Sequence, residues 1–400
     1  MKYWYQKPHP ALSKKILPSA LFFLLSHICP AQHKADTAIE NSIQRIENNI
    51  TRQNSSGEDK GKPQSLLSRM EALHIPGVSI AVFNEGSIQW AKGYGFSDKD
   101  ARSTIDTTTI FQAASISKPV ATVAMFALAE NKMINPDEDI NQQLSSWRIP
   151  GNEFTTEEKV TPRRIVSHMA GLSVHGFKGY NQTEKIPGLL QILDGITPAN
   201  SKPVRVISKP GSKEIYSGGG FTVLQLLMQE KTGKPFPELM NELVLQPAAM
   251  KRSMFSERLP DSMMQFLAKG HLKNGDMLKG GYNIYPEQAA AGLWTTPSDL
   301  ARFMINVGNS YRNNNGILQQ STVQTMLTKV PGGNGSGFGL EGEGDSFRFS
   351  HLGSNVGYFC YAVSFVNSGR GIVVMTNSDN GLQLIKEIVR AVYREYGWMK

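Results

Sequence analysis

Alternating apolar and polar positions predict strands near both ends of the chain. Two early runs rich in valine and isoleucine flank a short turn at Asn84–Gly86, which is typical of a β-hairpin. The late strands are followed by an amphipathic helix over residues 381–396. The predicted strands are residues 75–83 and 87–94, then 347–351, 357–366 and 371–376. We therefore expect one antiparallel sheet built from both ends of the chain.

The middle of the chain has helical patterning. Residues 120–129 are apolar nearly all round, which predicts that the helix over 111–131 is buried in a core. Thr161 before Pro162 and Thr296 before Pro297 have the pattern of a helix N-cap followed by proline at the first helical position. Residues 221–232 predict a further helix, whereas residues 173–210 are loop-rich and predict a lid or a substrate wall.

The first 31 residues have the pattern of a signal peptide. Their charge is entirely basic, and an apolar stretch of about ten residues follows over 16–25, too short for a membrane span. Small residues up to Ala31 predict cleavage before Gln32. The chain is therefore expected to be exported, to the periplasm or the medium. Two alternatives keep it tethered, namely lipidation at Cys29, which lacks the usual small residue before it, and an uncleaved N-terminus.

The polar segment over 32–65 predicts a linker, with a possible helix around 37–50 and its most flexible part at 54–63. The folded domain is then expected over 66–400. After cleavage Cys360 is the only cysteine left, so no internal disulfide forms and the core alone stabilises the fold.

Composition and charge argue against several classes of function. The chain has 400 residues, 40% of them hydrophobic, which suits a large globular core. The four lysines of the leader account for half of the net charge of +8, so the basic balance does not indicate nucleic acid. No histidine or cysteine cluster has the spacing of a metal site, so we expect no metal and no cofactor. The expected partner is a small molecule or short peptide, cell-wall fragments included; the sequence leaves the oligomeric state open.

The candidate chemistry starts at Ser115 and Lys118. Residues three apart lie on the same side of a helix, so one helical turn brings the hydroxyl and the amine together. Burial lowers the pKa of a lysine, which makes it a base that can accept the serine proton. Ser-x-x-Lys also occurs by chance, so the pair needs support from elsewhere in the chain.

Two further segments supply that support. Tyr216 stands on a glycine-rich turn before a helix, where a phenol near Lys118 can relay a proton, although an ordinary packed tyrosine fits the same pattern. His351 ends a predicted strand, and Gly353 lets a ligand backbone lie beside that strand. The backbone N–H groups of Ser354 and Ser115 would then form an oxyanion hole. Alone, a histidine in the position of His351 is more often a surface or hydrogen-bonded strand residue than a functional one.

Taken in order, Ser115-x-x-Lys118, Tyr216-Ser-Gly218 and His351-Leu-Gly353 resemble the three signatures of the serine β-lactamase and penicillin-binding-protein superfamily. The chain is most similar to the branch related to class C β-lactamases, which includes D-Ala-D-Ala carboxypeptidases, D-aminopeptidases and esterases. The similarity runs from about Pro76 to the C-terminus and includes the connecting segments 167–172, 233–236, 247–250 and 291–300.

This resemblance implies an α/β (α+β) fold of the β-lactamase/transpeptidase type, an antiparallel sheet flanked by helices beside a mainly helical region. It implies that Ser115 is the acylated nucleophile, Lys118 its proton-transfer partner and Tyr216 the general base, with the strand from His351 to Ser354 lining the site. His168 is expected to be structural.

Two positions depart from the resemblance. The third signature has histidine where class C β-lactamases have lysine, which weakens recognition of a carboxylate unless His351 is partly protonated. The second ends in Gly218 instead of asparagine. We therefore predict an exported serine hydrolase with a Ser115 acyl-enzyme, either a D-amino-acid peptidase or carboxypeptidase or an esterase. A β-lactamase is the alternative within this chemistry, and a catalytically silent protein that binds peptides or muropeptides is the alternative outside it.

Overall fold

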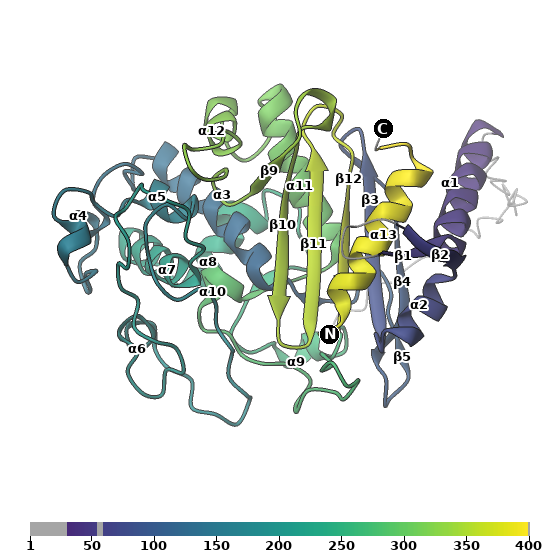
Figure 1. Cartoon of the computed structure of the whole chain (residues 1–400), viewed down its shortest axis with the longest axis horizontal. Coiled ribbons are helices and arrows are strands. Elements are labelled where there is room, and N and C mark those ends of the chain that lie inside the picture. Colours follow the sequence, from purple (N-terminus) through teal and green to yellow (C-terminus); the bar gives the residue numbers. More distant parts are fainter. Residues whose placement is uncertain (1–29, 54–58, 399–400) are drawn as a thin grey trace, which may run out of the picture. The chain divides into compact units, whose positions relative to one another are not determined.

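The computed structural model describes residues 30–53 and 59–398 (Figure 1). The chain divides after Asn41 into two units, and the described part of the first is the beginning of helix α1 (Pro30–Asn48). Everything below concerns the second unit. Nearly all of the predicted signal peptide, residues 1–29, lies outside the described residues. Within the described ranges, no helix is long and apolar enough to cross a membrane.

A seven-stranded antiparallel sheet forms the centre of the second unit, in the order β5-β4-β3-β12-β11-β10-β9. Its strands are β3 (Gly77–Asn84), β4 (Ser87–Asp98), β5 (Ser103–Thr104), β9 (Gly339–Glu341), β10 (Arg348–Asn355), β11 (Tyr358–Phe365) and β12 (Gly371–Thr376). All five predicted strands are present. The prediction of a sheet built from both ends of the chain is confirmed, because β3 pairs with β12, with Ile80 opposite Val374.

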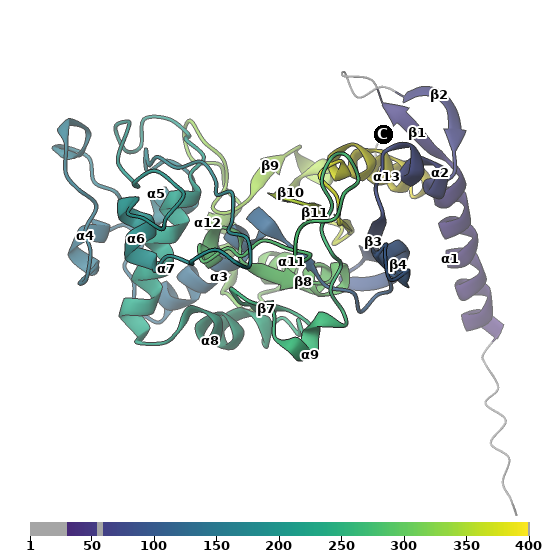
Figure 2. The same cartoon turned by 90° about the horizontal axis from the view of Figure 1, so that it is seen from below.

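Helices cover both faces of this sheet. Helix α13 (Gly381–Glu395), yellow in Figure 1, packs on β11 and β12, and α11 (Pro297–Asn313) packs on β3, β4, β11 and β12 (Figures 1 and 2). Every residue of β12 is buried and β3 is buried up to Phe83. A strand covered on both faces needs an unbroken apolar run instead of alternation, as both strands have.

The middle of the chain is mainly helical, as predicted. Its central helix α3 (Ser117–Glu130) is buried through Leu128, and α7 (Gly218–Thr232) through Met228. The shorter helices are α4 (Ile140–Gln143), α5 (Pro162–Val166), α6 (Leu189–Asp194), α8 (Phe236–Met240), α9 (Asp261–Met264), α10 (Gln288–Ala291) and α12 (Gln320–Met326). A small sheet of β6 (Phe111–Gln112), β8 (Leu293–Thr295) and β7 (Met254–Phe255) lies among them.

Two helix starts follow the predicted cap chemistry. The Thr161 side chain accepts the Arg164 N–H before α5, and the Thr296 side chain accepts the Asp299 N–H before α11. In both, proline occupies the first helical position, where its missing N–H costs nothing.

The segment before Leu66 is more ordered than its composition predicts. Strand β1 (Ile50–Gln53) pairs with β2 (Asp59–Gln64), so the prediction of a flexible linker over 54–63 is wrong for residues 59–63. The backbone groups of these two strands hydrogen-bond to each other, so β2 is ordered although its residues are mostly exposed. Arg394 of α13 contacts this hairpin by donating to the Asp59 carboxylate and the Thr51 hydroxyl.

A buried ion pair joins α13 to α2 (Leu66–Ala72). The Arg69 guanidinium donates to both carboxylate oxygens of Glu387, each at 2.9 Å, and the two side chains are 3% and 0% exposed. Gln383 donates a further hydrogen bond to the same carboxylate at 3.1 Å. Such a bidentate pair holds only while both charges are present, because either one alone is buried without a counter-charge.

We predict that Arg69→Met lowers the free energy of unfolding by about 3–5 kcal/mol, because it leaves the Glu387 carboxylate buried and unpaired. Urea denaturation followed by circular dichroism measures this. Lys209→Met is the matched control, because Lys209 pairs with Glu157 on the surface, and it should leave the transition midpoint in place. Restored stability in Arg69→Met/Glu387→Leu supports the account, and equal midpoints for Arg69→Met and wild type contradict it.

Candidate active site

Ser115 lies on a single 3-10 turn, Ala114–Ile116, between β6 and α3. The preceding residue, Ala114, has φ = 51°, a left-handed conformation that costs a side-chain-bearing residue free energy. Ser117 fixes the turn, because its hydroxyl donates to Ala114 O at 2.6 Å and accepts the Leu293 N–H at 3.0 Å. The Ser115 side chain thereby lies just before α3. The predicted helix over 111–131 is wrong for residues 111–116, which contain β6 and this turn.

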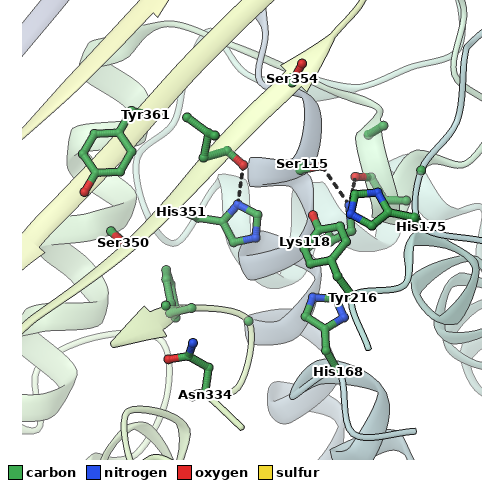
Figure 3. A pocket seen from close by; sticks show the side chains of 18 of the residues that line it. Ser115, Lys118, His168, His175, Tyr216, Asn334, Ser350, His351, Ser354 and Tyr361 are labelled. Carbon is green, nitrogen blue, oxygen red and sulfur yellow. Dashed lines mark hydrogen bonds between the residues drawn. The ribbon is translucent and has the colours of Figure 1, made fainter. Parts of the chain in front are cut away.

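Lys118 lies one turn along and is only 2% exposed. Its Nζ donates to Ser115 Oγ at 3.0 Å and to the backbone carbonyl of Ala290, in α10, at 2.8 Å (Figure 3). These two acceptors hold the ammonium group against the serine hydroxyl, in the arrangement that Ser-x-x-Lys predicts. The geometry places a proton-exchanging group within hydrogen-bond distance of a candidate nucleophile.

Tyr216 joins this pair from the segment before α7. The Lys118 Nζ lies 5.0 Å from the centroid of its ring, and the His168 ring packs against it at 4.2 Å (Figure 3). The next residue, Ser217, caps α7 by accepting the Gly220 N–H, which fixes the backbone that carries the tyrosine. The structure thus brings Tyr216 to a serine and a lysine that lie about 100 positions earlier in the sequence.

His168 packs against the Tyr216 ring and hydrogen-bonds to the next residue of the same segment. Its Nδ1 accepts the Ser217 N–H at 3.2 Å, and burial, followed by the charge of Lys118, holds the pKa of its ring well below the ordinary value. A neutral imidazole is what this hydrogen bond requires, because a protonated ring has no free lone pair to accept it. His168 therefore has the supporting position that the sequence predicts.

Strand β10 forms the opposite wall. A Cβ atom on Gly353 would lie 2.3 Å from both Ala113 O and Cys360 Sγ, so only glycine lets β10 pack against the turn that carries Ser115. His351 and Ser354 line the same cleft. The oxyanion hole from the Ser115 and Ser354 N–H groups stays a prediction.

His351 occupies the lysine position of the third signature. Its Nδ1 hydrogen-bonds to Leu352 O at 2.7 Å, while burial and the nearby charge of Lys118 lower its pKa to about 3. The ring is neutral at neutral pH. The partial protonation that would have let His351 replace the lysine of the third signature is therefore absent.

These residues surround a cleft of about 610 Å³. Among its described lining residues Lys118 is the only lysine or arginine. Sequence reasoning missed several lining residues, because they belong to no recognisable signature. Those with polar side chains include His175, Glu214, Asn334, Ser350 and Tyr361. The first of them lies in the segment 173–210, which was predicted as a wall without any particular residue being singled out.

Comparison with protein families gives one match over most of the chain. The model of the beta-lactamase family matches residues 64–392. Protein flp of Staphylococcus aureus strain MRSA252 is 23% identical over 323 residues, which is 77% of this chain and 60% of that protein. A beta-lactamase of Pseudomonas fluorescens is 27% identical over 59% of this chain and 60% of its own length. The matched region thus spans about three fifths of these relatives.

Solved structures with the same fold include an octameric penicillin-binding protein homologue from Pyrococcus abyssi, with a TM-score of 0.66, 22% identity, and coverage of 83% of this chain and 76% of that one. The D-amino acid amidase from Ochrobactrum anthropi SV3, in complex with L-phenylalanine, has a TM-score of 0.68 and 20% identity, covering 90% of this chain and 99% of that one. At these identities the likeness establishes the fold, which is the predicted β-lactamase/transpeptidase type.

We predict that His351 makes the protein less stable in mild acid. A base whose pKa is lowered on folding binds its proton in the unfolded chain first, so the stability present above about pH 6.5 is lost as the pH falls towards 3. His351→Gln removes this group. Between pH 7.5 and pH 5, wild type should lose about 1–2 kcal/mol more unfolding free energy than the variant. Urea titrations at both pH values measure the difference, and equal losses in the two proteins would argue against a neutral His351.

Proposed function

The chain belongs to the beta-lactamase family, and on that premise we propose that it is a serine hydrolase that forms an acyl-enzyme on Ser115. The observation that carries the proposal is the 3.0 Å hydrogen bond from Lys118 Nζ to Ser115 Oγ, inside a cleft that also holds Tyr216. A serine hydroxyl is a weak nucleophile until a neighbouring base removes its proton. Lys118 and Tyr216 are the groups in place to do so.

In this mechanism Ser115 Oγ attacks the substrate carbonyl while its proton passes to Tyr216, and the Lys118 ammonium group stays hydrogen-bonded to the serine oxygen. The backbone N–H groups of Ser115 and Ser354 stabilise the oxyanion. Tyr216 then gives the proton to the leaving group, and water hydrolyses the ester that remains on Ser115. Because Gly353 allows strand β10 to approach the Ser115 turn closely, the two N–H donors can meet around one oxygen.

The proposed substrate is a peptide, amide or ester, with D-amino-acid peptides and simple esters as the leading classes. Recognition of a free carboxylate calls for a cation in the cleft, as in β-lactams or peptides cleaved at the C-terminus. Among the described lining residues only Lys118 is a lysine or arginine, and its Nζ is already bound to Ser115 and Ala290. The fold is shared with a D-amino acid amidase, and this likeness supports amides among the proposed substrate classes.

Two candidates remain beside this one. Similarity to the beta-lactamase of Pseudomonas fluorescens supports β-lactam hydrolysis as the first of them, although His351 supplies no positive charge here. Gly218 lacks the asparagine side chain of the second signature, and His351 lacks the lysine side chain of the third. Both differences favour a silent peptide- or muropeptide-binding protein. A fluorophosphonate probe separates hydrolase from binder, since it labels only an activated serine.

Export is part of the proposal. The basic and then apolar pattern of the leader supports cleavage after Ala31. Intact-mass measurement of the protein from the native host should give a chain that begins at Gln32. A chain that retains Met1, or that carries a lipid on Cys29, would instead indicate a tethered protein.

We expect Ser115→Ala to lower hydrolysis by at least about 10³-fold and to remove fluorophosphonate labelling, because no other group can carry the acyl chain. Ser87→Ala, on the exposed start of β4, is the matched control and should keep wild-type rates. Full activity in Ser115→Ala would rule out the acyl-enzyme.

A panel of p-nitrophenyl acetate and butyrate, D-alanyl p-nitroanilide, a D-Ala-D-Ala peptide and nitrocefin then assigns the substrate class. Turnover of the anilide or of the esters, together with slow nitrocefin hydrolysis, is the expected outcome. Nitrocefin as the best substrate would show that the cleft recognises a carboxylate after all.

A further inference from the structure

The loop over residues 173–177 occupies the space beside Gly218, where the family signature carries an asparagine. The Gly218 N–H donates to His175 O at 3.1 Å, and the Gly219 N–H donates to Val174 O at 3.0 Å. A Cβ atom on Gly218 would lie 3.1 Å from the Phe177 ring and 3.2 Å from His175 O. An asparagine at 218 and this loop path therefore compete for the same space.

The backbone of the loop is strained at the residue that presents His175. Val174 has φ = 62°, in the left-handed region that a β-branched side chain rarely adopts. Such a conformation costs of order 1–3 kcal/mol and persists where the surroundings impose it. Here the two hydrogen bonds to the start of α7 impose it, and their result is a fixed position for His175.

The His175 ring lies on the candidate active site. Its centroid is 4.8 Å from that of the Tyr216 ring, and it lines the cleft together with Ser115 and Lys118 (Figure 3). The residue is exposed, and within the described part of the chain no group hydrogen-bonds to its ring nitrogens. The ring is therefore available to a water molecule or a substrate in the cleft.

The other two imidazoles of the cleft are poor proton acceptors. Burial lowers the pKa of His351 to about 3 and holds that of His168 well below its ordinary value. A general base works best when its pKa is near the operating pH, so neither residue suits the role at neutral pH. The other titratable or charged residues that line the cleft with His175 are Lys118, His168, Glu214, Tyr216, Glu341, His351 and Tyr361.

We propose that His175 is the general base that activates water for hydrolysis of the Ser115 acyl-enzyme. This inference rests on the proposed function and deepens it. The family signature has an asparagine side chain at position 218. Here the 173–177 loop occupies that space, and it places the His175 ring at the same wall of the cleft.

The step balances as follows. A water oxygen bonds to the acyl carbon while one water proton moves to a ring nitrogen of His175. The tetrahedral intermediate then collapses with breakage of the bond from carbon to Ser115 Oγ, and the Lys118 ammonium group donates a proton to that oxygen. The carboxylic acid leaves, and the proton on His175 passes through cleft water to the Lys118–Tyr216 pair, which restores the starting state.

The test is pre-steady-state hydrolysis of p-nitrophenyl acetate by His175→Gln. We expect a burst of p-nitrophenol with a rate within about threefold of wild type, because acylation uses Lys118 and Tyr216. The steady-state rate should fall by about 100-fold or more, the usual contribution of a general base, and the acetylated protein should accumulate in the mass spectrum.

His175→Ala provides a second measurement, because added imidazole should restore its turnover if the ring acts as a base. His74→Gln is the matched control, since His74 lines a different pocket, and it should behave as wild type. Equal loss of burst and steady-state rates without rescue, or unchanged turnover, would overturn the role of His175. Failure of wild type itself to show a burst or probe labelling would instead overturn the acyl-enzyme.

Discussion

The ammonium group of Lys118 is the constraint on which the site depends. A buried charge is tolerated only where hydrogen-bond acceptors surround it, and the acceptors here are the Ser115 hydroxyl and the Ala290 carbonyl. The second acceptor is itself held in place, because the Gln225 side chain of α7 accepts the Ala289 N–H and donates to Pro286 O. Three helices far apart in the chain, α3, α7 and α10, are thus joined around a single positive charge.

The same charge shapes the electrostatics of the cleft. Together with burial it disfavours protonation of His168 and His351, so a cleft with three imidazoles carries far less positive charge than its composition suggests. This differs from the usual expectation for a histidine at a lysine position, where partial protonation would preserve some attraction for anions. Burial and, after it, proximity to Lys118 remove that attraction at His351.

Much of the fold could be predicted from the sequence because its signals are local. The valine- and isoleucine-rich runs of β3 and β12, the threonine caps before Pro162 and Pro297, and the apolar surface of α3 each determine nearby structure. Ser115, Lys118 and Tyr216 were found through their signatures. His175 could not be found in this way, because its position depends on the strained Val174 and on contacts with Gly218 and Gly219, which no local pattern records. The order of residues 59–64 was missed for a similar reason, since it comes from pairing with β1 and contact with α13.

The pairing of β3 with β12 has a consequence for how the protein is made. Val78 lies opposite Thr376, so the centre of the sheet cannot close until the ribosome has synthesised about 300 residues beyond β3. Contacts between such distant residues make folding slow, because the entropy of closing a long loop is lost before the contact is gained. The nascent chain therefore stays without its central sheet while the residues between these two strands are synthesised. Under the export that we propose, this late closure would keep the chain competent for transport until β12 has emerged.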